Sequence, residues 1–140
     1  MSSSRDLFSQ LRDPRYFIDE RAELTKLLGS DDELLELELA SVGGRRPGML
    51  AITHTRVIHL YAAQFPRAVK VISIDHGEIA SVIVDSMWST GRIQLRLHRA
   101  RRVILFPHRT LYFLVSNVDR ALALAECLRT AVGRPNSANR

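Results

Sequence analysis

Basic side chains are concentrated between residues 92 and 109, where chemistry based on positive charge is most clearly indicated. Eight arginines and histidines lie in this stretch without a single aspartate or glutamate. Guanidinium groups attract the phosphates of lipids or nucleic acids, and they also attract acidic protein surfaces. Five of these residues are candidates for binding an anion or a partner: Arg92, Arg96, Arg101, Arg102 and Arg109.

The arginine cluster is also compatible with three further roles. Arg92, Gln94, Arg96 and His98 alternate with apolar residues, so they share one strand face, and that face can simply be solvated. The cluster can also pair with the protein's own acidic part. Residues 1–40 have five Lys/Arg against ten Asp/Glu, whereas residues 41–140 have fifteen Lys/Arg against five Asp/Glu. Single-strand nucleic acid binding is the third, although the nearby aromatic residues fall in runs typical of a buried core.

The patterns of known catalytic and metal chemistry are missing from the sequence. It contains no G-x-S-x-G, no P-loop and no H-E-x-x-H. The five histidines lack the close spacing of a metal site on one element. Asp75-His76 precedes Gly77, which is typical of a plain turn, and Cys127 lies among leucines of a predicted helix. We therefore expect no enzyme activity, no cofactor, no bound metal and no small-molecule substrate.

Two apolar features are candidates for an interface. Leu7, Phe8 and Leu11 are spaced as on one side of a short helix. Because this segment is short and its charges are mixed, we expect it to pack on the domain or on a neighbouring subunit rather than to enter a membrane. Trp88 stands beside the turn Ser89-Thr90-Gly91, where a tryptophan either packs at a rim or acts as an interface hot spot.

The composition is that of one ordinary folded domain. The 140 residues are 46% hydrophobic and 25% charged, with a net charge of +5. No run reaches the roughly 18 apolar residues of a membrane span, and the N-terminus lacks the pattern of a secretory signal. The single cysteine excludes an internal disulfide and suits a reducing compartment. We expect a cytoplasmic protein, and a peripheral position at a membrane stays open.

Periodicity predicts a helix, six or seven short strands and a closing helix. An apolar stripe after Asp13-Pro14 predicts the first helix over 14–28, and a second stripe after Asn117 predicts the last over 117–132. Between them, apolar and polar residues alternate as in antiparallel strands, most clearly over 93–97. We place a turn at Arg99–Arg102 that leads into the next strand.

Residues 48–58 carry a recognisable motif. Their sequence, Gly-Met-Leu-Ala-Ile-Thr-His-Thr-Arg-Val-Ile, resembles the G-x-L-x-[LI]-T-x-x-R-[LIV]-[IL] signature of bacterial pleckstrin-homology-like (PH-like) domains. Residues 72–75 with 79–82 are similar to the family's next pair of strands. The resemblance implies a mainly β fold, a bent antiparallel sheet or partly open barrel of about seven strands capped by a C-terminal helix. We divide the chain into an N-terminal helical extension, a PH-like domain and a disordered tail: 1–33, 34–132 and 133–140.

Within this motif, Thr53 and Arg56 are expected to have a structural role. A threonine suits a tight corner between strands, and the five donors of an arginine can bind loop carbonyls or a carboxylate. The resemblance also implies what a lipid-binding member needs, a lysine-rich pattern across its first two strands. This sequence departs from it, because Glu36 and Glu38 stand on the first strand and no lysine occurs between Lys26 and Lys70.

These observations predict a class of role. We expect a non-catalytic binding or assembly module that acts through protein–protein contact or self-association. A homo-oligomer is one form of it, because the edges of an open sheet need to be covered. The alternative is a module that binds an anionic surface, phospholipid headgroups or nucleic acid, through the arginine-rich stretch.

Overall fold

The structure is a computed structural model, and it describes residues 17–42, 46–64, 67–103 and 106–133. Leu7, Phe8 and Leu11 lie outside these residues. In chain order the elements are α2 (Ile18–Leu28), β1 (Leu34–Val42), β2 (Arg46–Thr53), β3 (Arg56–Gln64), β4 (Arg67–Asp75), the 3-10 turn η1 (His76–Glu78), β5 (Ile79–Met87), β6 (Thr90–Val103), β7 (Phe106–Val115) and α3 (Val118–Gly133).

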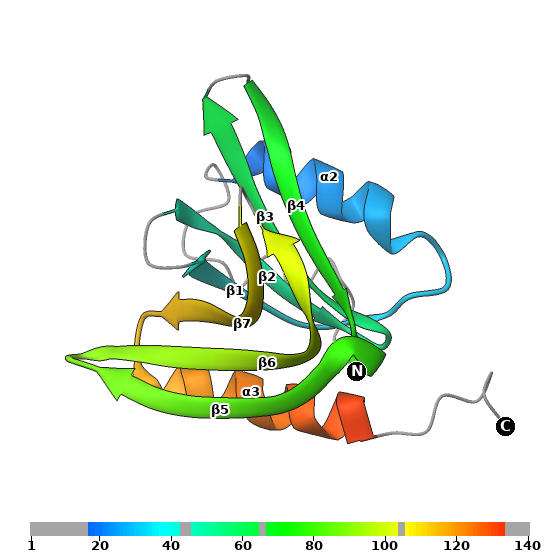
Figure 1. Cartoon of the computed structure of the whole chain (residues 1–140). Coiled ribbons are helices and arrows are strands. Elements are labelled where there is room, and N and C mark those ends of the chain that lie inside the picture. Colours follow the sequence, from blue (N-terminus) through cyan, green and yellow to red (C-terminus); the bar gives the residue numbers. More distant parts are fainter. Residues whose placement is uncertain (1–16, 43–45, 65–66, 104–105, 134–140) are drawn as a thin grey trace, which may run out of the picture.

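The strands form one seven-stranded sheet in the order β4-β3-β2-β1-β7-β6-β5, and every neighbouring pair is antiparallel. The sheet is strongly bent, and α3 lies along the half made of β5 and β6 (Figure 1). This confirms the predicted mainly β, PH-like architecture with a C-terminal helix. β4 and β5 are the two edge strands.

The inner side of the bent sheet encloses the main core. Alternate residues of β6 and β7 point inward, and α3 covers them with its apolar stripe, as period-two strands facing an amphipathic helix require. The largest fully buried side chain is Phe113. The helix contributes its buried face: Ala121, Leu124 and Leu128.

A second apolar cluster lies on the outer side of β1–β3, under α2. Leu24 and Leu28 of the helix pack there against Met49, Ile58 and Leu60, all of them buried. In Figure 1 α2 runs beside β3 and β4, on the other side of the sheet from α3. β2 and β3 are therefore buried on both faces, which fits the apolar run 49–52 and the run 57–60, where the only polar residue is the buried His59.

The first helix begins later than the prediction of residue 14. α2 starts at Ile18, and its N-cap residue Phe17 has a φ of 63°, in the left-handed region. A residue in that conformation cannot continue a right-handed helix, so the helix begins after it. No side chain caps this end.

The predicted turn at Arg99–Arg102 is wrong, because β6 runs through these residues to Val103. Arginine has no turn-forming chemistry, and the β pattern simply continues. The pairing of β6 with β7 shifts register between Arg96 and Arg101, which is an irregularity that bends the strand. Four of the predicted arginines therefore lie along β6, with Arg101 and Arg102 near the end of the β6–β7 hairpin, and Arg109 lies on β7.

Candidate binding surface

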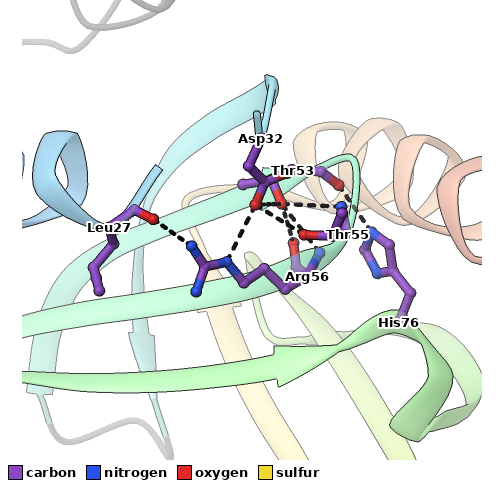
Figure 2. A network of polar contacts seen from close by, with 6 residues as sticks. All are labelled: Leu27, Asp32, Thr53, Thr55, Arg56 and His76. Atoms are coloured by element: carbon purple, nitrogen blue, oxygen red, sulfur yellow. Dashed lines mark hydrogen bonds and ion pairs between the residues drawn. The ribbon is translucent and has the colours of Figure 1, made fainter. Parts of the chain in front are cut away.

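The motif residues Thr53 and Arg56 meet at the β2–β3 corner around a single carboxylate (Figure 2). Asp32 Oδ2 accepts hydrogen bonds from Thr53 Oγ1 and Thr55 Oγ1, both at 2.9 Å, and from Arg56 Nε at 3.2 Å. Thr53 Oγ1 also accepts the backbone N–H groups of Thr55 and Arg56, at 3.2 and 3.0 Å. These contacts close the corner and bind it to the segment that leads into β1.

The same arginine also reaches the N-terminal helix. Arg56 Nη2 donates to the backbone oxygen of Leu27, in the last turn of α2. A cation at a helix C-terminus meets carbonyls without helical partners, so this contact favours the observed helix end. With its guanidinium shared between Asp32 and Leu27, Arg56 is engaged inside the protein rather than presented to a ligand.

Two histidines hold backbone carbonyls in the interior. His76 Nε2 lies 2.8 Å from the carbonyl of Thr53, and His59 Nε2 lies 2.8 Å from that of Ala40. The His59 ring packs near Phe113, with centroids 5.5 Å apart, and a Cβ on Gly48 would lie only 2.8 Å from the ring. Burial lowers the pKa of His59, although its bond to Ala40 opposes the shift. Both histidines are thus buried and bind a backbone carbonyl of the protein itself.

The acidic N-terminal part pairs with basic residues outside the arginine-rich stretch. Glu36 and Glu38 of β1 bind Arg120 of α3, at 2.8 and 2.5 Å. Burial alone would lower the pKa of Arg120, but the two carboxylates outweigh it and the pKa is raised. Glu33 lies 3.1 Å from His54. Together with the Asp32–Arg56 pair, these contacts use four acids of residues 1–40 within the protein.

The outer side of β5, β6 and β7 forms what we call the open face. Residues directly opposite in an antiparallel pair share a face, so the pairing sorts this surface into three rows across the strands. The middle row has two exposed apolar side chains, since Ile83 is 46% and Tyr112 is 39% exposed. The three rows are Ser81–Arg96–Thr110, Ile83–Gln94–Tyr112 and Asp85–Arg92–Leu114.

Arg92, one of the predicted anion-binding residues, is engaged on the open face. Its Nε and Nη2 donate to the two oxygens of Asp85, at 2.7 and 2.5 Å, and Gln94 donates to the same carboxylate at 2.7 Å. The hydrogen bond from Arg92 is the main reason that the pKa of Asp85 is lowered. The Arg92 guanidinium also lies over the Tyr112 ring, 5.1 Å from its centroid. The Asp85–Arg92 pair is neutral in sum.

The other predicted arginines differ from Arg92. Arg96 is exposed on the open face, and Arg99 is exposed further along β6; neither forms an ion pair within the described residues. Arg109 Nε donates to the backbone oxygen of Leu97 at 3.1 Å. Arg101 and Arg102 belong to β6 and pair with β7, and their side chains lie outside what the structure describes. The five predicted arginines therefore follow one strand and its neighbour, and among the described side chains Arg92 and Arg109 have separate partners.

Trp88, a predicted interface residue, stands at the tip of the β5–β6 hairpin. Met87 pairs with Thr90, so the connection has only two residues, Trp88 and Ser89. The Trp88 side chain is 95% exposed, and its φ of 63° lies in the left-handed region that glycine prefers. The chain's only tryptophan is thus placed at the tip of a hairpin whose inner side is covered by α3 and whose outer side is the open face.

Sequence reasoning missed the residues that complete these sites. Asp32 and Arg120 gather partners that are 21 to 84 positions away, such as Thr53 and Glu36. No local pattern marks such contacts. The covered outer side of β1–β3 did have a signal, because the runs 49–52 and 57–60 lack the alternation of a half-exposed strand.

Some kinds of site are not found in the described part of the chain. There, no group of three His, Cys, Asp or Glu residues could hold a metal ion. Nor does any described helix have the length and apolar character to cross a membrane.

The architecture defines a fold class: the sheet and its C-terminal helix have a PH-like fold, and an additional N-terminal helix packs on the sheet. No family model matches the sequence, and no curated protein matches it in sequence. The likeness is therefore one of structure.

Three solved structures show this likeness. The Vps36 N-terminal PH domain superposes with a TM-score of 0.51 at 15% identity, covering 74% of this chain and 84% of that one. A pleckstrin homology domain from Shewanella amazonensis SB2B gives 0.50 at 19% identity, with 84% and 99% covered. The hSac2 domain of the human phosphoinositide phosphatase Sac2 gives 0.54 at 12% identity, with 94% and 84% covered. At these identities the likeness concerns the fold.

Proposed function

We propose that this protein is a non-catalytic binding and assembly module that contacts proteins, its own copies included, through the open face. One observation carries the proposal. α2 covers the outer side of β1–β3, whereas the outer side of β5–β7 has Ile83 and Tyr112 exposed within the described structure.

The chemistry of the open face suits a protein partner. Tyrosine, tryptophan and arginine are enriched where proteins meet, and an aliphatic side chain such as Ile83 fits a protein surface better than it fits phosphates. The middle row has no charged side chain, and the Asp85–Arg92 pair in the next row is neutral in sum, so attraction at the centre of this face depends on apolar area and shape.

The alternative is an anionic-surface binder, for phospholipid headgroups or nucleic acid. The exposure of Arg96 and Arg99 without an ion pair among the described residues favours it, as does the absence of carboxylates over 92–109. Arg92, Arg101, Arg102 and Arg109 would complete that surface, and a peripheral place at a membrane would go with it. The PH-like fold accommodates both functions.

Light scattering on the size-exclusion peak separates the two functions. At about 150 and 500 mM NaCl, which bracket the range where exposed charges become screened, we expect the same mass above one chain. Anionic vesicles and oligonucleotides are added in parallel at both salts. Mass of one chain throughout, with vesicles or oligonucleotides bound at the lower salt and released at the higher, would contradict the proposal and support the alternative.

A further inference from the structure

The open face has an uncharged centre and one basic end. The Asp85–Arg92 pair is neutral in sum, and the middle row beside it has no charged side chain. Past the middle row, Arg96 is exposed on β6, Arg99 follows it on the same strand, and Arg109 is exposed on β7. We call these three arginines the basic end. A partner is attracted there by charge and held at the centre by apolar contact.

The positive charge of the basic end is poorly compensated by the described residues around it. The stretch 92–109 contains no aspartate or glutamate. Arg96 and Arg99 have no ion pair among the described residues, and Arg109 donates to a backbone oxygen, which leaves its charge in place. Glu78, just before β5, accepts a backbone N–H that caps η1. One carboxylate near three arginines leaves this end of the face positive.

The acidic part of the chain, residues 1–40, does not match the basic end. Four of its carboxylates pair with other residues of the domain: Asp32, Glu33, Glu36 and Glu38. Three more stand on α2, which covers the outer side of β1–β3. Residues 1–16 carry two aspartates against three arginines, so their net charge is positive, like that of the basic end. Carboxylates that match the basic end are therefore expected on another molecule.

We infer that the open face binds an extended acidic segment of a partner protein. The carboxylates of this segment lie against the basic end, and its apolar side chains lie against Ile83 and Tyr112. Arg96 is two residues from Gln94 on β6, or about 7 Å, and Arg99 is about 10 Å further. Residues two and three apart in an extended segment have the same spacings, so such a segment can place a side chain at each. The inference rests on the proposed function and names the chemistry of the partner.

The spread of the arginines favours protein carboxylates over phosphate groups. A phosphate is bound most strongly by donors that converge on it, whereas Arg96 and Arg99 are about 10 Å apart along one strand. The centre of the face adds to this preference, because Ile83 is 46% exposed and gains from apolar side chains but not from a phosphate backbone.

Trp88 lies where the other end of such a segment arrives. Arg99 follows Thr90 by nine residues of β6, about 30 Å of strand, and Trp88 stands at the hairpin tip before Thr90. The Trp88 side chain is 95% exposed, and its backbone has the left-handed φ of 63° that side chains rarely adopt. Strain of this kind concentrates at functional positions. We therefore expect Trp88 to contact the apolar end of the segment.

A library of random peptides displayed on phage tests the inference on the full chain. Peptides of twelve residues suffice, because an extended segment of that length spans about 40 Å. We expect the enriched peptides to carry aspartate or glutamate toward one end and aliphatic or aromatic residues toward the other. Ile83→Arg is panned in parallel and should lose these peptides, because it places a charge in the apolar centre.

Substitutions at the two ends of the face are measured on one selected peptide, labelled and followed by fluorescence anisotropy. Arg96→Glu should raise the Kd about tenfold, because an attractive charge becomes repulsive. Lys70→Glu is the matched control, since it makes the same change of charge at an exposed residue of β4, the opposite sheet edge. It should raise the Kd less than about twofold. Trp88→Gly should raise the Kd about thirtyfold, the size of a hot spot, and keep the hairpin, because glycine accepts the positive φ.

Competition with the selected peptide distinguishes other occupants of the open face. A synthetic peptide of residues 1–16 should not displace it, and displacement would assign the face to the chain's own N-terminal segment. Anionic vesicles and oligonucleotides at about 150 mM NaCl should not displace it either, and displacement by them would assign the face to phosphates. Either displacement would overturn the inference. Because the proposed function places other copies of the chain on the same face, the selected peptide should also lower the mass of the wild type.

The outcomes separate the inference from the proposed function. If the enriched peptides lack acidic residues but are lost with Ile83→Arg, the acidic segment is wrong and the open face stands as a protein contact. If no peptide is enriched, the inference is overturned and light scattering decides the proposed function. If the enriched peptides bind Ile83→Arg and Arg96→Glu as tightly as the wild type, the open face is not the contact and both are overturned.

Discussion

Asp32 connects three parts of the molecule through one carboxylate oxygen. Its side chain is only 10% exposed, and it accepts from Thr53, Thr55 and Arg56. Thr53 is fully buried, so losing the acceptor would leave a buried hydroxyl and a guanidinium with fewer partners. The corner thus depends on a residue outside the T-x-x-R element.

We predict that Asp32→Ala lowers the free energy of unfolding by about 2 kcal/mol, because buried polar groups lose their partner. Asp31→Ala is the matched control: its neighbouring carboxylate is exposed, and a change of at most about 0.5 kcal/mol is expected. Urea denaturation followed by circular dichroism measures both. Equal effects of the two changes would mean that the network contributes nothing to stability.

His59 predicts a pH dependence of stability. Its pKa is lowered in the folded state, mainly by burial, so folding favours the neutral ring. An unfolded histidine titrates near pH 6.5, and below that the unfolded chain gains a proton that the folded chain resists. The stabilisation is complete above about pH 6.5 and decreases as the pH falls, by at most about 1.4 kcal/mol per unit.

Comparing the wild type with His59→Leu isolates this contribution. The variant loses the bond to Ala40 and is less stable throughout, but its unfolding free energy should vary less between about pH 7 and pH 5. Urea denaturation across that range gives both slopes. Parallel curves for the two proteins would show that His59 titrates alike in the folded and unfolded states.

The sequence predicts which residues share a strand face, but it does not predict which of them form ion pairs. The alternation of Arg92, Gln94 and Arg96 with buried neighbours is local, and the strand period reveals it. Which arginine is paired is not local, because Arg92 finds Asp85 across a hairpin while Arg96 faces Ser81. The roles predicted for these arginines, for Trp88 and for Thr53 stay predictions that the experiments above test.

At the scale of elements, α2 covers the outer side of β1–β3 and forms a second apolar core with it. Leu24 has no exposed surface and packs with Leu28 against β2 and β3, while Ile18 on the same helix is 60% exposed. The helix is held at its end by Arg56 through Leu27. The sequence predicted an apolar stripe here, but which strands it covers follows only from the sheet topology.

We predict that Leu24→Ala lowers the free energy of unfolding by about 3 kcal/mol, because it leaves a cavity in a close-packed cluster. Ile18→Ala, on the exposed side of the same helix, should change it by less than about 1 kcal/mol. Thermal and urea denaturation check the pair. If Leu24→Ala is no more harmful than Ile18→Ala, α2 is only loosely attached and the first 33 residues behave as a separate extension.

Two predicted element boundaries were wrong: the start of the first helix and the end of β6. The helix start moved to Ile18 because Phe17 is left-handed, and β6 continued through Arg99–Arg102 because nothing there forms a turn. The succession along the chain of a helix, six or seven strands and a closing helix was predictable, since amphipathic periods distinguish strands from helices.

At the scale of the whole molecule, the outer side of β1–β3 and the outer side of β5–β7 differ in what covers them. One is covered by α2, and the other has exposed apolar residues beside the paired Arg92 and the exposed Arg96. Asp32, Glu36 and Glu38 neutralise Arg56 and Arg120 within the fold, so these three acids do not screen the open face. The open face is therefore the surface through which we expect the protein to act.

The most direct test of this account compares two exposed apolar residues on opposite sheet edges. Ile83 on β5 is 46% exposed and Val71 on β4 is 38% exposed, so arginine should be tolerated by the fold at both. The mass is measured by light scattering at high protein concentration. We predict a wild-type mass above the 15.9 kDa of one chain, the same mass for Val71→Arg, and the mass of one chain for Ile83→Arg. Assembly of Ile83→Arg like the wild type, or a monomeric wild type, would contradict the account.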